Sequence, residues 1–322
     1  VPSPSPIAIC DEDAIQDGIH PFNLGTLVTP QLLNGLPSGL AADYYLSFAD
    51  ALVEKNKIGP IFTNTQAFQQ TIYTRIKNGL DCYGITPVTL VVNTFDPVNF
   101  EEETTFLCTG SNLNLSVDSR FSSYLWNTGA TTAAITVQQA GTYTITVTND
   151  KGCKKTKTFI VKASEKAIYE NAVVKDFAGN KNTITIQYKG TGDYEFSLDG
   201  TSYQDNATFT NVAPGSYTIS IRDKNGCGIT TSDLIYVLDY PRFFTPNGDG
   251  FNDTWKINNL GSLPQSRIVI FDRYGKLLKE LTTADDSWNG TFTGAPLPSD
   301  DYWFQLIFAD GKIIKGHFSL KR

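Results

Sequence analysis

The segment GTYTITVTNDKGC, residues 141–153, recurs as GSYTISIRDKNGC at residues 215–227. The offset is 74 residues, and the closing cysteine keeps its register. Weaker copies lie upstream at 71–82 (TIYTRIKNGLDC) and downstream at 301–311 (DYWFQLIFADG). A period of about seventy to eighty residues suits one small β-sandwich. The sequence therefore predicts an all-β fold, a tandem array of four small Ig-like β-sandwich domains.

Each copy predicts a strand that begins at a tyrosine corner and ends in a tight turn. The tyrosine hydroxyl can bond a backbone group upstream while its ring enters the core. Alternation then places Ile145 and Val147, or Ile219 and Ile221, on one buried face. The Asp, Asn, Lys and Gly residues that follow favour a hairpin turn.

Polar stretches separate the copies and predict the domain boundaries. They lie at Asn93–Glu103, Lys162–Asn171 and Asp239–Pro241. The predicted domains are 1–94, 95–163, 164–239 and 240–322. Ser47 is a suitable N-cap for a short helix over Phe48–Glu54.

Charge and composition narrow the class of protein. The formal net charge of −7 makes nucleic acid an unsuitable partner. Residues 241–322 carry a net charge of +1, so the acidic excess lies in the first 240 residues. No apolar run has the length of a membrane span. The chain has no methionine, and we expect it to be a mature or excised C-terminal part of a longer protein.

The run FFTPNGDGFNDTW, residues 243–255, opens a second ordered set of motifs. RIVIFDRYGK follows at 267–276, SWNGT at 287–291, PSDDYW at 298–303 and KGHFSLKR at 315–322. This order resembles the type B C-terminal sorting domain of Bacteroidetes proteins exported by the type IX secretion system, the gliding-motility-associated or CHU_C-like form. Asp300 departs from the family's usual glycine, and Tyr274 from its commoner tryptophan.

The resemblance implies a function for the last domain. A sorting domain of this family is read in the periplasm, crosses the outer membrane through the type IX translocon and directs attachment to the cell surface. The implied partners are translocon components and a PorP/SprF-like outer-membrane protein. The sorting-signal residues carried over are Thr245, Pro246, Asn247, Gly248, Asp249, Gly250, Asn252 and Asp253. Because this domain is nearly neutral, its basic residues are available, and we expect partner contacts at Arg273, Lys276, Lys321 and Arg322.

The first three domains also resemble surface repeats. Residues 1–94 resemble an Ig-like repeat found upstream of these sorting domains. Residues 95–163 resemble PKD/Ig-like repeats, with Trp126 as the buried core tryptophan. Residues 164–239 resemble the repeats of gliding adhesins of the SprB kind, but Phe177 lies in the region of their usual early cysteine. The resemblance implies a stalk and sorting signal of a large cell-surface adhesin or gliding protein.

Five cysteines in an exported β-rich chain predict disulfides with one thiol left over. Cys10 and Cys82 bracket the first repeat, and Cys108 and Cys153 bracket the second. We predict a disulfide within each of these pairs. Each would stabilise its domain by about 4 kcal/mol. Cys227 would then be free, either a buried small apolar residue or an intermolecular or redox thiol.

Two oxygen-rich loops are candidates for calcium, and no other cofactor is predicted. One contains Asn247, Asp249 and Asp253, and the other Asp11, Asp13 and Asp17 before Gly18. Carboxylates at alternate loop positions with glycines hold hard cations. The alternative is that these side chains only cap turns through their own backbone.

Catalysis has little support in the sequence, so we expect no enzyme activity. His20 and His317 are the two histidines, and neither belongs to a nucleophile, metal or phosphate-binding motif. Alternative readings are a carbohydrate-binding adhesin module and the non-catalytic C-terminal part of a secreted polysaccharide-degrading enzyme. For sugar stacking we expect Trp255 and Trp288 to be exposed, with Trp126 and Trp303 in the core.

Overall fold

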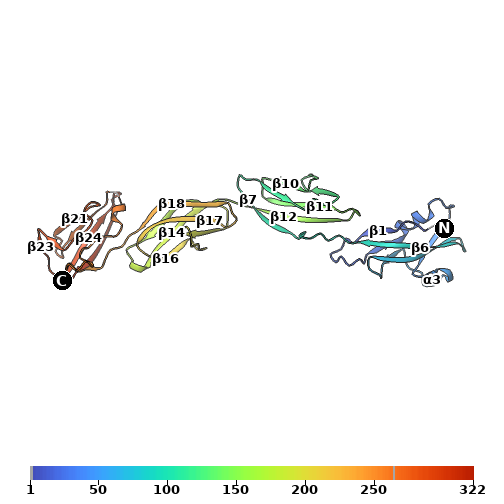
Figure 1. The fold of residues 1–322 in the computed structure, drawn as a ribbon, viewed down its shortest axis with the longest axis horizontal. Helices are drawn as coiled ribbons and strands as arrows, with labels where there is room; N and C mark the ends of the chain where they lie inside the picture. The colour runs from blue at the N-terminus through green and yellow to red at the C-terminus, as the bar shows by residue number, and fades with distance from the viewer. Residues whose placement is uncertain (1–2, 264) are drawn as a thin grey trace. The chain divides into compact units, whose positions relative to one another are not determined.

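The computed structural model describes residues 3–263 and 265–322, and its regular secondary structure is mostly β-strand (Figure 1). The chain forms two compact units, Val1–Lys162 and Ala163–Arg322. Among the described residues each unit contains two hydrophobic clusters, so there are four cores along the chain. Strands hold 49% of the chain and helices 6%. The predicted all-β class of Ig-like sandwiches is confirmed.

The first module, which we define as residues 3–94, surrounds one core. Its elements are β1 (Ile7–Cys10), β2 (Pro21–Asn23), α1 (Leu24–Leu27), α2 (Thr29–Leu33), β3 (Ala41–Tyr45), α3 (Phe48–Val53), β4 (Ile61–Thr63), β5 (Gln69–Asn78) and β6 (Asp81–Asn93). The main sheet has the order β1-β6-β5-β3, and β2 pairs with β4. Ser47 accepts a hydrogen bond from the Asp50 amide at 3.0 Å, so the predicted helix cap is confirmed.

The second module, residues 95–162, is a sandwich of two sheets. Its strands are β7 (Glu103–Cys108), β8 (Leu113–Ser116), β9 (Ser123–Trp126), β10 (Ala134–Val137), β11 (Gly141–Thr148) and β12 (Lys154–Ser164). The sheets are β7-β12-β11-β9 and β10-β8. Trp126 is buried and stacks on Phe159 at 5.8 Å between ring centroids, as the sequence predicts for a core tryptophan.

The third module, residues 163–237, repeats this plan in the second unit. Its elements are β13 (Ile168–Lys175), the 3-10 turn η1 (Gly179–Lys181), β14 (Asn182–Lys189), β15 (Tyr194–Ser197), β16 (Thr208–Val212), β17 (Gly215–Asp223) and β18 (Gly228–Val237). The sheets are β13-β14-β16 and β15-β17-β18. Because β12 continues to Ser164 and β13 begins at Ile168, the polar stretch from Lys162 to Asn171 is mostly strand rather than linker.

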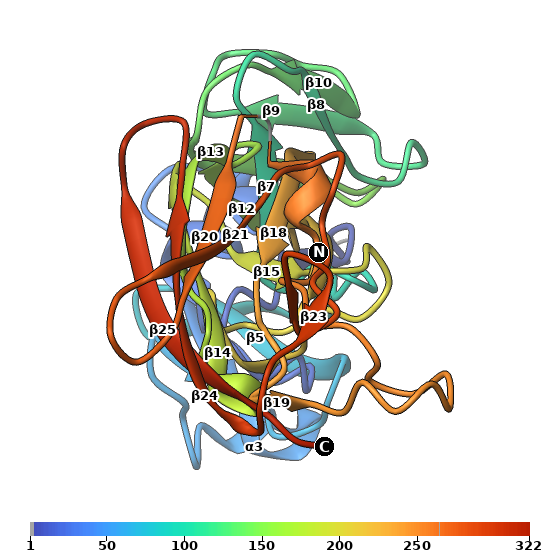
Figure 2. The same ribbon diagram turned by 90° about the vertical axis from the view of Figure 1, so that its left-hand side faces the viewer.

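The last module, residues 238–322, contains a five-stranded sheet. Its elements are β19 (Phe243–Phe244), the 3-10 turn η2 (Leu260–Ser262), β20 (Arg267–Phe271), β21 (Leu277–Leu281), β22 (Thr291–Phe292), β23 (Ala295–Pro296), β24 (Asp300–Ile307) and β25 (Ile313–Leu320). The sheet order is β19-β25-β24-β20-β21. Figure 2 shows β24 and β25 side by side, as their antiparallel pairing requires.

Three tyrosine corners confirm the local prediction from the repeat. Each hydroxyl donates to the carbonyl four residues upstream: Tyr143 to Gln139 (2.9 Å), Tyr217 to Ala213 (2.7 Å) and Tyr302 to Pro298 (2.9 Å). The predicted inward residues Ile145, Val147, Ile219 and Ile221 are all fully buried. The corner therefore fixes both the start of each strand and the face that it buries.

The chain has disulfides and one free cysteine, as predicted, but the predicted pairing is wrong. Cys10 bonds Cys153 in the second module, so neither the Cys10–Cys82 nor the Cys108–Cys153 bridge forms. The reason is strand order: β1 runs parallel to the end of β6, where Cys10 pairs with Asn93. Cys82 lies at the opposite end of β6, about 36 Å away along an extended strand.

The free cysteine is also a different residue from the predicted one. Cys82 is free and exposed at the β5–β6 hairpin. Cys227 is disulfide-bonded rather than free, and Cys108 is disulfide-bonded as well.

Candidate functional site

The loop from Thr245 to Thr254 is held by its own side chains. The Asp253 carboxylate accepts hydrogen bonds from the amides of Gly248 (2.7 Å) and Gly250 (2.8 Å). Both glycines have positive φ, +82° and +85°, which other residues adopt only with strain. The loop therefore needs glycine at these two positions and a carboxylate at position 253.

Asp249 caps a second turn in the same loop. Its carboxylate accepts from the Phe251 amide and from the Asn247 side chain, both at 2.8 Å. Both hydrogen bonds lower the pKa of the Asp249 carboxyl below its usual value, and the bond from the Phe251 amide has the larger effect. These bonds are what turn capping predicts, and they occupy oxygens that the calcium hypothesis assigns to an ion.

Arg322 closes the module onto this loop. Its amide donates to Ser299 Oγ at 2.8 Å, and its guanidinium donates to the carbonyls of Leu297 (3.0 Å), Gly290 (3.3 Å) and Pro246 (3.5 Å). Gly290, of the SWNGT motif, has φ +75°, and an added Cβ would lie 2.4 Å from the Leu320 side chain. The last residue thus ties three motifs together, a structural role beside the predicted partner contact.

The other three predicted contact residues are exposed but already engaged within the module. Arg273 forms an ion pair with Asp300. The Lys276 ammonium lies 4.3 Å from the centre of the Phe292 ring, and that of Lys321 lies 4.5 Å from the Phe243 ring. Such cation–π contacts at exposed sites are weak, about 0.5–1 kcal/mol. A partner with stronger acceptors can therefore compete for these cations.

The Thr245–Thr254 loop, the Asp272–Lys276 turn and Arg322 lie at one end of the five-stranded sheet, which we call the loop end. Arg273 reaches Asp300 at the start of β24, and Arg322 reaches Pro246 in the loop. The opposite end of β24 leads into the hairpin before β25, some 25 Å away for an eight-residue strand.

The opposite end faces the third module. The Phe177 amide donates to Leu238 O at 3.1 Å, the Phe177 ring lies 5.9 Å from that of Tyr240, and the Lys312 charge acts on Asp176. None of these contacts involves a residue of the Thr245–Thr254 loop.

Two exposed aromatic side chains at the loop end are functional candidates that the sequence argument missed. Phe251 is 76% exposed and Tyr274 is 86% exposed. Their sequence context could have indicated this exposure. Each aromatic residue stands in a polar turn, without the alternation of apolar and polar residues that marks a buried strand face. Large exposed apolar side chains beside cations are typical of interaction surfaces.

The tryptophans are distributed differently from the expectation. Trp255 and Trp288 are buried, and their backbones bond each other in both directions at 2.8 and 2.9 Å. Trp303, expected in the core, is 41% exposed. Tyr302 and Phe304 occupy the buried face of β24, so alternation turns Trp303 outward. A sugar platform built on Trp255 and Trp288 is excluded by their burial.

The acidic loop of the first module brings together a different set of residues from the predicted one. Asp11, Asp13 and His20 offer ligand atoms that all lie within 4.8 Å of one another. Asp17 instead accepts a hydrogen bond from the Ile19 amide at 2.9 Å, as a turn cap. His20 replaces Asp17 in the cluster, and no local sequence pattern marks it.

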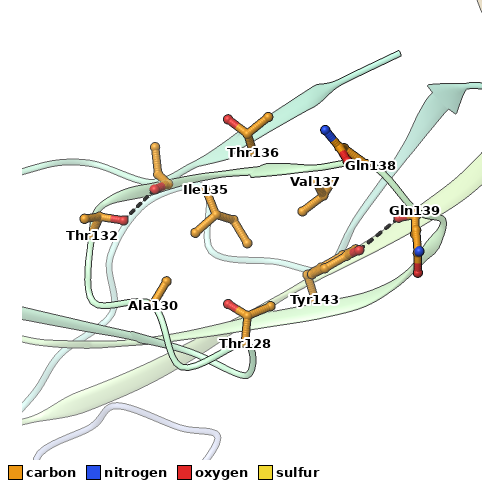
Figure 3. A pocket seen from close by; sticks show the side chains of 10 residues that line it. Thr128, Ala130, Thr132, Ile135, Thr136, Val137, Gln138, Gln139 and Tyr143 are labelled. Atoms are coloured by element: carbon orange, nitrogen blue, oxygen red, sulfur yellow. Dashed lines mark hydrogen bonds between the residues drawn. The ribbon is translucent and has the colours of Figure 1, made fainter. Parts of the chain in front are cut away.

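An open hollow of about 590 Å³ lies in the second module beside β10 and the start of β11. Figure 3 shows Ile135 and Val137 pointing into it, with Thr136 turned away on the same strand. Tyr143 lines it from the facing strand, its hydroxyl held by Gln139. Polar threonine and glutamine side chains around an aromatic ring suit a hydroxyl-rich ligand.

Two family models match parts of the chain. Residues 238–319 match the CHU_C Type IX secretion signal domain. Residues 6–97 match FIDD, the Flavobacterium inter-domain disulphide bond domain, and the Cys10–Cys153 bond does join two separate cores. The chain therefore carries a type IX secretion signal domain behind Ig-like modules. Such a domain implies handling by the type IX secretion machinery and export across the outer membrane to the cell surface.

Solved structures similar to the chain are tandem immunoglobulin domains. The eight N-terminal Ig domains of Down Syndrome Cell Adhesion Molecule are 11% identical, with a TM-score of 0.28, over 95% of this chain and 45% of that one. Sidekick-1 domains 1–5 are 10% identical, with a TM-score of 0.29, over 98% and 78%. The insect immune protein hemolin is 11% identical, with a TM-score of 0.21, over 98% and 97%. No curated protein sequence matches the chain.

Among the described residues, no helix is both long and apolar enough to cross a membrane.

Proposed function

We propose that this chain, which ends in a type IX secretion signal domain, is the stalk and sorting signal of a large cell-surface adhesin or gliding protein. The first three modules act as spacers, and the last module is read by the export machinery. The loop end is the surface that is read. We assign no catalytic role to any of the four modules.

The observation that carries this proposal is the composition of the loop end. Phe251 and Tyr274 are exposed there, in a loop and a turn that also carry the exposed cations Arg273 and Lys276 beside the capping carboxylates Asp249 and Asp253. Turn caps hold the loop, so little ordering entropy is lost on binding. An outer-membrane protein of the PorP/SprF kind, with acidic and apolar groups on its periplasmic side, is the partner that we propose.

Surface display tests the proposal directly. A passenger fused to the full chain is expressed in a bacterium with a type IX system and quantified at the surface by antibody labelling of intact cells. We expect the double change Phe251→Ala and Tyr274→Ala to lower display at least fivefold with unchanged melting temperature, because both side chains are exposed.

Controls separate recognition from stability. Ile313→Ala removes an exposed apolar side chain at the opposite end of the sheet, where Ile313 pairs with Ile307, and should leave display unchanged. Asp253→Ala should lower both melting temperature and display, because two backbone amides lose their acceptor. Normal display of the double variant would refute the loop end as the surface that is read. Normal display after deletion of residues 238–322 would refute the sorting function.

A second candidate function, carbohydrate binding, rests on the hollow beside Tyr143. A glycan array with the purified chain tests it, with Gln138→Ala as the variant because Gln138 is exposed and lines the hollow. Glycan binding that this variant weakens would support an adhesin module. A blank array would leave the stalk as the role of this region.

A further inference from the structure

The first module buries a carboxylate oxygen that has no hydrogen-bond partner. The Asp11 side chain is fully buried, and its Oδ2 accepts from the Gly18 amide at 2.8 Å. Its Oδ1 faces His20 Nδ1 at 3.9 Å, and both atoms lack a hydrogen-bond partner among the described residues. Leaving a buried carboxylate oxygen without a partner is costly.

A direct hydrogen bond does not explain this pair. The 3.9 Å separation exceeds the 2.7–3.2 Å of an N–H···O bond. Two ligands of a tetrahedral zinc ion, at bonds of about 2.1 Å, lie about 3.4 Å apart. The Asp11 and His20 atoms are thus close to the spacing that one shared ion sets, and Asp13 supplies a third ligand atom within 4.8 Å.

Hydrogen bonds within the protein hold the surrounding loop. The buried Asn64 side chain accepts from the His20 amide at 2.7 Å and donates to Gly18 O at 2.7 Å. Gly18 has φ +78°, and an added Cβ would lie 2.5 Å from the Phe68 ring. One oxygen of Asp13 is fixed by the Ile15 amide at 2.8 Å. Bonds of this kind orient metal ligands in proteins.

We propose that Asp11, Asp13 and His20 bind one divalent transition-metal ion, with Zn²⁺ the best fit. An imidazole nitrogen with two carboxylates is a mixed ligand set that suits zinc, whereas calcium is bound by oxygen ligands. The site replaces the predicted Asp11, Asp13 and Asp17 calcium loop, since Asp17 lies outside the cluster. Water completes the coordination of the ion.

The position of the site connects it to the junction of the first two modules. The Asp11 amide donates to Asn93 O at 2.9 Å, and Gln16 joins Asp11 O (2.6 Å) to the Phe95 amide (2.7 Å). Cys10, the neighbour of Asp11, is bonded to Cys153. A bound ion would therefore stabilise the same segment that the disulfide anchors.

Metal titration of the full chain without an affinity tag tests the site. All proteins carry Cys82→Ser, because the exposed Cys82 thiol is itself a metal ligand. Isothermal titration with ZnCl₂ should show one site per chain, and CoCl₂ should give a visible absorption band. We expect Asp13→Asn and His20→Gln each to weaken Zn²⁺ binding at least about 10-fold, because loss of a bond that only supports a ligand already costs about 10- to 100-fold.

Matched variants make the outcome decisive. His317→Gln removes the other, exposed histidine, and Asp17→Asn keeps the cap on Ile19, so neither should alter binding. Asp13 is exposed, so Asp13→Asn should fold normally. The absence of Zn²⁺ binding, binding unaffected by both Asp13→Asn and His20→Gln, or Ca²⁺ binding as tight as Zn²⁺ would overturn the proposal.

Discussion

At the scale of single residues, the last module uses carboxylates to shape its loop. Asp249 and Asp253 each accept from backbone amides that have no strand or helix partner. Asp300, which stands where the family usually has glycine, accepts from the Asp301 amide and pairs with Arg273; these contacts, in that order, lower its carboxyl pKa. The departure from the family pattern thus adds a tie to the Asp272–Lys276 turn.

The Asp249 cap should persist into acid. Its folded pKa is lowered, so its contribution to stability is complete above the unfolded value of about 3.9 and disappears as the pH falls through the lower folded value. We expect the NMR shift of the Phe251 amide to stay constant from pH 7 to about 4 and to change only below. Asp249→Asn should abolish the transition. A midpoint at or above 3.9 would contradict the cap.

The burial of Trp303 was predicted wrongly because the tyrosine-corner rule and the alternation of a strand were not combined. The corner rule places the Tyr302 ring in the core, and alternation then requires Trp303 to face outward, as it does. Assigning Trp303 to the core from its position in a strand, without asking which face of the strand it occupies, led to the wrong expectation. Trp255 and Trp288 follow loops, and contacts distant in sequence bury them: their backbones pair with each other, and both rings pack against Phe318.

At the scale of elements, the tyrosine corner with its hairpin is the unit that recurs. The corner bond spans four residues and the hairpin turn about the same length, so both depend on local sequence. That is why the strands β11, β17 and β24 could be placed from the repeat alone. The Asp11–His20 cluster could not, because Asn64, more than forty residues away, closes that loop.

The corner hydroxyl should contribute measurably to the last module. Tyr302 is buried, and its hydroxyl bonds Pro298 O at 2.9 Å. Tyr302→Phe keeps the ring and removes this bond, so we expect a loss of about 1 kcal/mol in the free energy of unfolding. Fluorescence of the neighbouring Trp288, 5.2 Å away between ring centroids, reports the transition. Tyr274→Phe, at an exposed site, is the control, and an equal effect of both changes would count against the corner.

At the scale of the whole molecule, covalent bonds between modules were beyond prediction from spacing. The predicted pairs rested on the assumption that each disulfide joins two cysteines of the same repeat. The parallel pairing of β1 with β6 places Cys10 at the end of its module, beside Asn93. Cys153 lies in the next module and contacts Asn93 O through its sulfur at 3.8 Å. Which end of a long strand a cysteine occupies depends on sheet order, and the repeat does not contain that information.

Peptide mapping should show this pattern directly. We expect a non-reducing digest to contain a Cys10 peptide linked to a Cys153 peptide, and iodoacetamide to label Cys82 alone in the native chain. Cys82→Ser should leave the melting temperature unchanged, because the thiol is exposed. Recovery of a Cys10–Cys82 link from native protein would contradict the sheet order of the first module.

The distant partner of Cys10 also has a consequence for the order of folding events. Cys82 precedes Cys153 in the chain, so a growing or emerging polypeptide offers Cys10 the wrong thiol first. Once β1 pairs with the end of β6, that thiol is held far away and exchange between them stops. The native bond then waits until the second module has formed its β11–β12 hairpin. We therefore expect closure of the bond to be a late event, and early oxidation to delay maturation until the wrong pair is reshuffled.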